Sequence, residues 1–412
     1  MERIVARYLF DPEMTAGKMI FLTGPRQVGK TTFARNWLAS VGGGDAYFNW
    51  DDPAVIREYR RNPLCFKNII EERYRGEPVP FVFDEIHKQK NWRDILKGVY
   101  DPNREKIRLL VTGSARLGLY RKSGDSLVGR YFAYQMLPLG LPEAAGDFSF
   151  VLKDDLPIAH GETLLGEVRK VDPDKIRESL SKLLCYGGFP EPFLRASPNF
   201  HRRWQAVYKT LLTREDVRDL SRISDIRGLE HLVELLPEKV GSPLSVNSLR
   251  EDLNAHHSTI VKWIDILKEL YLVFTVRPWQ GQLPRSIRKE PKLYFMDWSL
   301  LPEAGFRFEN LLAVSLWRMA ARFTETGLGA FEVMYIRDAS KREVDFVLVK
   351  DNEPLALFEA KEGGREIGPA GRHFSQKLAI PYYQIVHRLD RPEAFPGNCF
   401  LLPASTFLML TG

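Results

Sequence analysis

A glycine-rich stretch between an apolar run and a helix-forming run is the feature that most constrains this chain. Residues 19–32 read MIFLTGPRQVGKTT, and Gly24, Gly29, Lys30 and Thr31 fit the pattern G-x-x-x-x-G-K-[ST]. Glycines let backbone N–H groups curl around anionic oxygens, and the N-terminus of the following helix adds partial positive charge. A plain glycine turn would imitate part of this pattern. The apolar strand before it and the helix after it favour a phosphate-binding P-loop.

The P-loop predicts ATP and Mg²⁺ as ligands. The expected nucleotide contacts come from the loop and the first helical turn: Gly24, Pro25, Arg26, Gln27, Val28, Gly29, Lys30, Thr31 and Thr32. In such a loop the lysine reaches the terminal phosphates and the hydroxyl binds Mg²⁺, which assigns these roles to Lys30 and Thr31.

Two later apolar runs end in residues suited to ATP hydrolysis. The strand predicted at residues 81–83 ends in Asp84 and Glu85, about fifty residues after the P-loop. We expect Asp84 to hold Mg²⁺ and Glu85 to orient the attacking water. A buried strand that ends in a solvated acidic turn is the alternative. A further strand at residues 109–112 is followed by Ser114, which is placed to lie between Glu85 and the terminal phosphate.

Together these motifs resemble a family. TGPRQVGKTT, FVFDE, LLVTGSAR, Gly129–Arg130 and the residues 137–139 resemble AAA-type ATPases of bacteria and archaea that carry a C-terminal domain of unknown function, and residues 186–191 match their linker region. The resemblance implies an additional-strand P-loop core that binds ATP, with Ser114 in the sensor position. It also makes Arg130 a sensor or finger arginine, although a solvated arginine near a turn is the alternative. It supplies no substrate.

Composition sets outer limits on the class of protein. The chain has 412 residues, of which 44% are hydrophobic and 27% charged, as expected for a soluble protein of several domains. A net charge of +6 permits a nucleic-acid partner without establishing one. Three widely spaced cysteines argue against structural zinc and favour a reducing compartment. No apolar run approaches the ~20 residues that span a bilayer, so we expect a cytoplasmic protein with no membrane partner.

The middle of the chain predicts a helical lid or linker followed by a winged helix-turn-helix. Ser245 can cap a first helix, and a second runs from Ser258 to about Tyr271, with a strand at residues 272–276. The polar face of the second helix offers Ser258, Thr259 and Lys262 for contact with DNA. Winged helices also serve as structural lids and as docks for proteins, which remain alternatives.

The last third holds a second set of chemical candidates. Glu309 lies on a predicted helix, Asp345 on a strand, and Glu359 and Lys361 form an E-x-K series on the next strand. This series resembles the PD-(D/E)XK nuclease superfamily, with Arg342 and Glu343 standing before the aspartate in place of a proline. The resemblance implies that Glu309, Asp345 and Glu359 hold Mg²⁺, or Mn²⁺ in its place, while Lys361 orients the attacking water. Surface strands that merely end in Glu and Lys are the alternative.

Strand register tests whether the two strands of this series can cooperate. If Lys350 opposed Leu355, paired residue numbers would sum to 705, and Glu359 and Lys361 would face away from Asp345. We therefore predict an even sum, such as 704 or 706, produced by an odd-length loop or a bulge.

The sequence thus predicts an α/β multidomain protein. The expected parts are a P-loop ATPase domain at 1–140, a helical lid at 141–238, a winged helix at 239–285 and a restriction-endonuclease-like α/β domain at 286–412. The leading functional hypothesis is an ATPase that controls Mg²⁺-dependent cleavage of DNA, in genome maintenance or defence. The alternative is a non-cleaving regulatory or scaffold ATPase that binds nucleic acid or a protein partner. A homo-oligomer is compatible with either.

Overall fold

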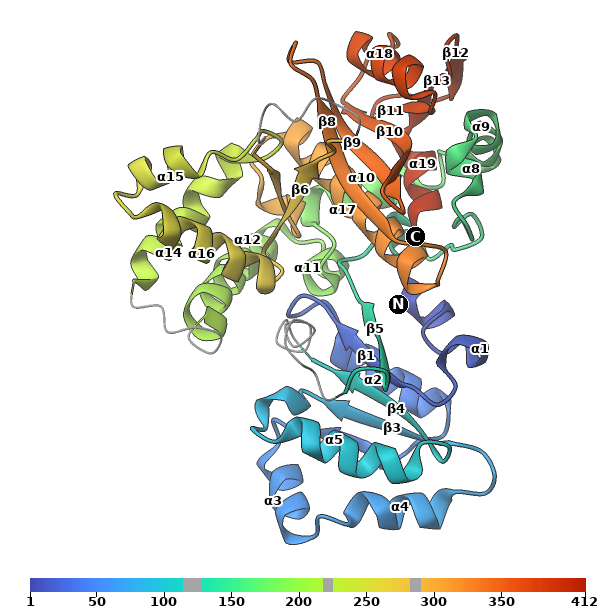
Figure 1. Cartoon of the computed structure of the whole chain (residues 1–412), viewed down its shortest axis with the longest axis vertical. Coiled ribbons are helices and arrows are strands. Elements are labelled where there is room, and N and C mark those ends of the chain that lie inside the picture. The colour runs from blue at the N-terminus through green and yellow to red at the C-terminus, as the bar shows by residue number, and fades with distance from the viewer. Residues whose placement is uncertain (114–126, 218–224, 282–289) are drawn as a thin grey trace. The chain divides into compact units, whose positions relative to one another are not determined.

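The computed structural model describes residues 1–113, 127–217, 225–281 and 290–412. These residues form two compact units. The N-terminal unit consists of Val5–Leu137 with Glu269–Tyr271, and the C-terminal unit consists of Met1–Ile4, Pro138–Lys268 and Leu272–Gly412. Figure 1 shows the helices and strands of both units, coloured from blue at the N-terminus to red at the C-terminus.

The N-terminal unit is built on a five-stranded parallel sheet. Its strands are β1 (Met19–Thr23), β2 (Tyr47–Asn49), β3 (Val79–Asp84), β4 (Ile107–Thr112) and β5 (Tyr131–Gln135). The order across the sheet is β2-β3-β4-β1-β5, and every neighbouring pair is parallel. Strand β4 therefore lies between β1 and β3, which confirms the additional-strand core that the family resemblance implied.

Helices cover both faces of this sheet. They are α1 (Pro12–Thr15), α2 (Lys30–Ser40), α3 (Pro53–Arg61), α4 (Cys65–Arg73) and α5 (Trp92–Tyr100). Alternate strand residues such as Phe21, Phe83 and Val111 pack with α4 and α5 in one apolar core. Helix α2 contacts β3 and β4, and its buried Phe33 and Leu38 are not part of that core, so it covers the opposite face.

The C-terminal unit begins with a run of helices. These are α7 (Leu141–Ala145), α8 (Leu156–Ala159), α9 (Gly161–Lys170), α10 (Arg177–Tyr186), α11 (Pro190–Arg195), α12 (Pro198–Thr210), a π-helix (Leu211–Asp216) and α14 (Ile226–Leu235). The described residues of the segment predicted as a helical lid or linker are therefore mainly helical.

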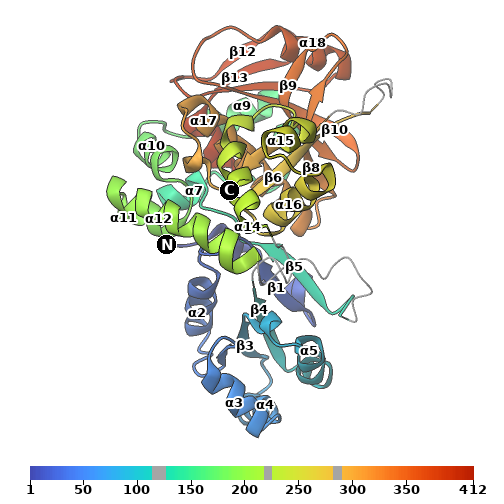
Figure 2. The ribbon, with the colours of Figure 1, turned by 90° about the vertical axis from the view of Figure 1, so that its left-hand side faces the viewer.

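Two helices and a hairpin follow. Ser245 caps α15 (Val246–Asp252) by accepting a hydrogen bond from the Ser248 N–H, and Asn254 takes a positive φ in the turn before α16 (His257–Glu269). The antiparallel strands β6 (Val273–Pro278) and β7 (Lys292–Phe295) come next. Figure 2 shows α14, α15 and α16 grouped together on one side of this unit.

An eight-stranded mixed sheet forms the rest of the C-terminal unit. Its other strands are β8 (Phe331–Arg337), β9 (Glu343–Lys350), β10 (Glu353–Lys361), β11 (Tyr382–Val386), β12 (Glu393–Phe395) and β13 (Cys399–Pro403). Three helices accompany them: α17 (Ala304–Glu325), α18 (Pro369–Leu378) and α19 (Ala404–Thr411). The order is β12-β13-β11-β10-β9-β8-β6-β7, so this sheet continues across the domain boundary predicted after residue 285.

The register between β9 and β10 agrees with the prediction. The pairs Ala356–Leu348, Leu357–Val347 and Phe358–Phe346 all sum to 704, after a bulge between Pro354 and Ala356. A second bulge was not predicted. Between β8 and β9 the pairing shifts at the level of Tyr335, so that the two residues Asp345 and Phe346 oppose one residue of β8.

No helix within the described part of the chain is long and apolar enough to cross a membrane.

Candidate functional sites

The P-loop follows β1 at the carboxyl end of the parallel sheet, where α/β folds bind their ligands. Gly24 adopts φ +147°, and a Cβ there would lie 2.1 Å from the Met136 carbonyl oxygen, so only glycine fits. Gly29 also has a positive φ, directly before α2. Lys30 is buried, and its Nζ donates to the carbonyl oxygens of Gly24 and Pro25 at 2.9 and 2.7 Å. The loop thus holds its lysine within the cradle that the sequence predicted.

Asp84 lies at the centre of a set of hydroxyl groups at the same edge of the sheet. Thr31 Oγ1 and the Tyr47 hydroxyl donate to Asp84 Oδ2 at 2.8 and 2.5 Å, and Thr112 Oγ1 donates to Oδ1. The predicted partners Thr31 and Asp84 are therefore in direct contact, as residues that share one Mg²⁺ should be. Sequence reasoning missed Tyr47, the first residue of β2, and Thr112, the last residue of a strand that it had predicted.

Glu85 follows Asp84 in the left-handed backbone conformation, with φ +58°. Its N–H bonds to the Thr112 carbonyl oxygen at 3.0 Å, and its Oε2 lies 3.6 Å from His87 Nε2. Burial raises the pKa of Glu85, while the nearby charge of Lys30 opposes the rise. A carboxyl group with a raised pKa near bound phosphate suits a residue that handles the attacking water.

Arg130 lies too far from the P-loop to contact ATP that is bound by its own chain. Its carbonyl oxygen accepts from the N–H of Met19, the first residue of β1, and its guanidinium pairs with Asp101 at 2.7 Å. The P-loop follows the other end of β1, five residues and about 15 Å away. We therefore remove Arg130 from the contacts to ATP held by the same chain. Ser114 lies outside the described residues.

In the C-terminal unit, the predicted acids surround a lysine that the sequence reasoning did not single out. Lys292 Nζ lies 2.7 Å from Glu343 Oε1 and 3.2 Å from Asp345 Oδ1. Its side chain is only 1% exposed, and although burial works against its charge, Asp345 and the other acids raise its pKa. On α17, Glu309 accepts from the Tyr294 hydroxyl at 2.8 Å. Burial and the charge of Asp345 raise the pKa of Glu309 to about 7.

Glu359 and Lys361 form an ion pair of their own, on either side of Ala360, whose N–H donates to Asp345. Lys361 Nζ lies 2.5 Å from Glu359 Oε1, and the Tyr382 hydroxyl donates to Glu359 Oε2 at 2.5 Å. Glu359 Oε2 also lies against Gly368 at the start of α18, where a Cβ would be 3.2 Å from it.

The expected metal centre of Glu309, Asp345 and Glu359 is therefore not assembled. Within the described ranges, no three His, Cys, Asp or Glu side chains are close enough to hold a metal ion. In the structure each carboxylate contacts a different side chain of its own: Tyr294, Lys292 or Lys361, respectively. The register prediction was right, but it could not reveal the bulge at Asp345 or the lysine from β7.

The three residues proposed for DNA contact lie at the N-terminal end of α16. Ser258 and Lys262 are exposed and Thr259 is half-buried, while Ile260, Trp263 and Leu267 form the buried face. Asp265 pairs with Lys268 at 3.1 Å near the other end of the helix, which leaves the N-terminal end with a positive side chain.

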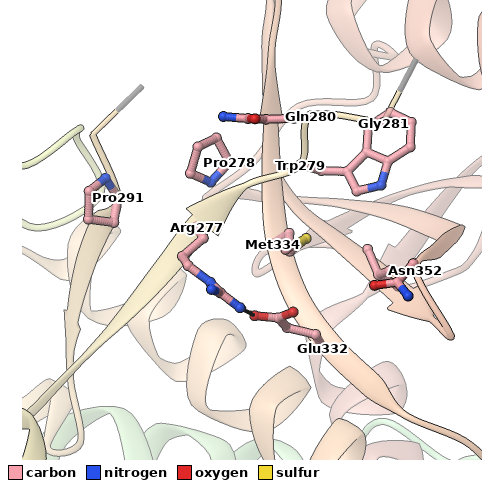
Figure 3. Close-up of a pocket in the computed structure, with 10 residues that line it drawn as sticks. Arg277, Pro278, Trp279, Gln280, Gly281, Pro291, Glu332, Met334 and Asn352 are labelled. Carbon is pink, nitrogen blue, oxygen red and sulfur yellow. Dashed lines mark hydrogen bonds and ion pairs between the residues drawn. The ribbon is translucent and has the colours of Figure 1, made fainter. Parts of the chain in front are cut away.

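A pocket of about 640 Å³ lies beside β6 and β8 (Figure 3). Arg277 and Glu332 form an ion pair of 2.5 Å in its wall, and Trp279 and Met334 add apolar surface. None of the predicted site residues lines this pocket.

Family models match two segments of the chain. Residues 16–145 match the model described as "AAA domain", and residues 177–310 match one described as "Domain of unknown function" (DUF8612). The first segment contains the P-loop, Asp84, Glu85 and the whole parallel sheet. It is therefore a P-loop ATPase domain of the AAA type, and ATP is its expected ligand.

Curated relatives of the chain carry no functional name. "Uncharacterized protein MJ1637" of Methanocaldococcus jannaschii is 25% identical over 303 residues, which cover 68% of this chain and 60% of that protein. "Uncharacterized protein Rv2008c" of Mycobacterium tuberculosis is 21% identical over 283 residues, covering 69% of this chain and 55% of that protein. The chain thus spans little more than half the length of these relatives.

Solved structures show only distant similarity. The Aeropyrum pernix ORC1 protein in complex with DNA gives a TM-score of 0.28 at 15% identity, covering 72% of this chain and 86% of that chain. AMPPCP-bound DnaA from Aquifex aeolicus gives 0.26 at 16% identity, covering 65% and 86%. At these TM-scores the similarity carries no argument about this chain.

Proposed function

We propose that the N-terminal unit binds ATP together with Mg²⁺ and hydrolyses the terminal phosphate. The observation that carries this proposal is the direct hydrogen bond between Thr31 and Asp84 beside the P-loop lysine. These are the oxygen donors that Mg²⁺ prefers, and they come from the first turn of α2 and from the end of β3, both beside the phosphate cradle. When bound, Mg²⁺ supplies positive charge that offsets the charge developing on the transferred phosphoryl group.

The chain's own residues divide the remaining work. Lys30 leaves the carbonyl oxygens of Gly24 and Pro25 and binds the terminal phosphate oxygens. Glu85 orients a water molecule towards the γ-phosphorus. The oxygen of this water forms a bond to phosphorus as the bond to the β–γ bridging oxygen breaks, which yields ADP and inorganic phosphate.

ATP binding and turnover test these roles separately. We expect Lys30→Ala to weaken ATP binding strongly. Glu85→Gln should keep the Kd for ATP while lowering kcat by about 100-fold, the usual contribution of a positioned acid–base group. Lys67→Ala, which removes an exposed lysine of α4 paired with Glu71, is the matched control. Normal turnover in Glu85→Gln would contradict the role given to that residue.

We also propose that the C-terminal sheet belongs to the restriction-endonuclease-like class and that α15, α16 and the β6–β7 hairpin form a winged helix-turn-helix. In support of the first, the elements α17, β8, β9, β10, α18 and β11 follow one another as αβββαβ, with β11 parallel to β10. In support of the second, the turn at Asn254 joins two helices that are followed by an antiparallel hairpin.

For the activity of this unit we propose the alternative hypothesis, in which the chain is a non-cleaving regulatory or scaffold ATPase that binds nucleic acid or a protein partner; of these partners we propose DNA. The observation in its favour is the ion pair between Lys292 and Asp345, which takes up the aspartate that cleavage would need for a metal. A panel of single-stranded, duplex and branched DNA with Mg²⁺ or Mn²⁺ tests it. We expect binding without cleavage, with and without ATP. Cleavage that Asp345→Ala removes would restore the nuclease hypothesis.

A further inference from the structure

Lys292 lies at a junction between two parts of the C-terminal unit. It is the first residue of β7, whose partner strand β6 directly follows the helices α15 and α16. From there its ammonium group reaches the two acids of β9, Glu343 and Asp345. A buried charge of this kind persists only if the groups around it compensate for the water it has lost.

Each oxygen of these two acids has a partner from the chain. Glu343 binds Lys292 through Oε1 at 2.7 Å and Arg337 through Oε2 at 3.4 Å. Asp345 binds Lys292 through Oδ1 at 3.2 Å, and its Oδ2 accepts from the Ala360 N–H at 3.2 Å. The last bond lies directly beyond the pair Phe346–Phe358, where the regular pairing of β9 with β10 ends.

A divalent metal would need the same oxygens. Mg²⁺ and Mn²⁺ bind carboxylate oxygens at about 2.0–2.2 Å, closer than any hydrogen bond, and two cations cannot share one oxygen at such distances without strong repulsion. The neighbouring Glu309 adds negative charge but is itself bound to the Tyr294 hydroxyl. The cluster of Glu309, Glu343 and Asp345 thus has a positive charge supplied from within the chain.

We infer that Lys292 takes the place of a divalent cation at this cluster, so that neither Mg²⁺ nor Mn²⁺ binds Asp345 while Lys292 is present. The ammonium group connects the β6–β7 hairpin to β9. It does so at the place where the nuclease resemblance implied a metal ion. This inference does not depend on the ATPase, and its failure would leave the roles of Lys30 and Glu85 untouched.

Titration with Mn²⁺, followed by electron paramagnetic resonance in the absence of nucleotide, tests the inference on the folded full-length chain. All proteins carry Asp84→Asn, which removes the carboxylate next to the P-loop from the count. We expect Asp345→Asn to change neither the number of bound Mn²⁺ ions nor their affinity. A Mn²⁺ ion that binds the parent protein and is lost in Asp345→Asn would overturn the inference.

Removing the ammonium should create the missing site. We expect Lys292→Gln to gain one bound Mn²⁺ per chain, and the further change Asp345→Asn to abolish that gain. Lys350→Gln is the matched control, because it removes a lysine of the same sheet that is paired with Asp155 at 3.0 Å. A gain of equal size in Lys350→Gln, or no gain in folded Lys292→Gln, would contradict the proposal.

Lys292→Gln by itself leaves the buried acids Glu343 and Asp345 without their cation and can fail to fold. The pair of changes Lys292→Gln and Glu343→Gln removes one acid along with the lysine and keeps Asp345 and Glu309. It should show the same gain of one Mn²⁺ that depends on Asp345. The comparison of the parent protein with Asp345→Asn tests whether Mn²⁺ binds Asp345 while Lys292 is present, and it does not require that either Lys292→Gln variant folds.

Discussion

Asp84 illustrates how several side chains prepare one carboxylate for its ligand. The hydroxyls of Thr31 and Tyr47 both donate to Oδ2, and Thr112 donates to Oδ1. Of the three, only Thr31 belongs to the P-loop. Tyr47 stands on the edge strand β2, where its ring also lies under the Arg35 guanidinium at 4.7 Å from the ring centre. Tyr47 therefore holds Asp84 from outside the nucleotide site.

Replacing this tyrosine should affect Mg²⁺ more than ATP. We expect Tyr47→Phe to raise the Mg²⁺ concentration for half-maximal ATP hydrolysis by about tenfold, because groups that orient a metal ligand typically contribute this much to affinity. ATP binding measured without Mg²⁺ should not change. Tyr59→Phe is the control, because Tyr59 packs on Trp50 in the apolar core of the same unit and is not bonded to Asp84. An unaltered Mg²⁺ requirement would show that Tyr47 only packs.

Asp297 is a second buried carboxylate, and it belongs to none of the predicted sites. Its Oδ1 accepts from the Ser299 N–H and Oγ, at 3.0 and 2.6 Å, whereas none of the described residues forms a hydrogen bond with its Oδ2. Gly187, in the linker motif, adopts φ +75°, and a Cβ there would lie 2.3 Å from Asp297 Oδ1. The glycine is needed because the carboxylate occupies the space that a side chain would fill.

The pH dependence of stability should reveal this aspartate. Burial raises the pKa of Asp297 to about 6, against 3.8 in the unfolded chain, so the folded state keeps a proton that the unfolded state loses. The free energy of unfolding should therefore fall as pH rises through this window, by about 3 kcal/mol for a shift of roughly two pH units. In Asp297→Asn this fall should disappear. Urea midpoints measured across the window for both proteins test it, and parallel curves would contradict the prediction.

At the scale of elements, two bulges govern what the C-terminal strands can do. The bulge in β10 gives the even register that places Leu357 opposite Val347. The bulge in β9 interrupts the alternation at Asp345, next to the lysine of β7. Each bulge adds one residue to its strand and so moves the following side chains to the opposite face of the sheet. The side chains that meet near Asp345 therefore depend on both bulges together.

Helix α16 allows a direct test of the DNA proposal. If its N-terminal end faces DNA, Lys262→Ala should weaken binding to any duplex and reduce the slope of log Kd against log salt by about one, since one phosphate contact is lost. Lys268→Ala removes a lysine from the other end of the same helix, where it pairs with Asp265, and should leave the slope unchanged. Fluorescence anisotropy at several salt concentrations measures both. Equal effects of the two changes would point to net charge rather than to a defined contact.

At the scale of the whole molecule, Arg130 raises the question of assembly. It lies at the amino end of the parallel sheet, far from the P-loop of its own chain. An arginine there can assist ATP hydrolysis only at the P-loop of a neighbouring copy, as an arginine finger supplied by another subunit does. We propose this role for Arg130 in a homo-oligomer.

Mixing inactive variants tests this assembly. Arg130→Ala and Lys30→Ala should each lose most ATPase activity alone, but a mixture should recover part of it. Recovery is expected because an intact P-loop can then meet an intact arginine from the other variant. Asp101→Ala, which removes only the partner of Arg130, should retain activity. Full activity of Arg130→Ala alone would contradict the proposal.

The sequence by itself determined the features that depend on short stretches of chain. The spacing of Gly24, Gly29 and Lys30 was enough for the P-loop, because one turn and one helix start create the phosphate cradle. The acids Asp84 and Glu85 followed from their place at the end of an apolar strand. An even register for β9 and β10 followed from the two-residue alternation of strands.

Only the tertiary structure decided what meets across the sheets. Lys292 is 53 residues from Asp345 and belongs to another hairpin, so no local pattern connects the two. Tyr47 reaches Asp84 because β2 lies beside β3, and Arg130 is separated from the P-loop because β5 lies parallel to β1. A buried charge selects its partner by proximity in three dimensions, and that proximity is set by strand order and bulges rather than by residue spacing.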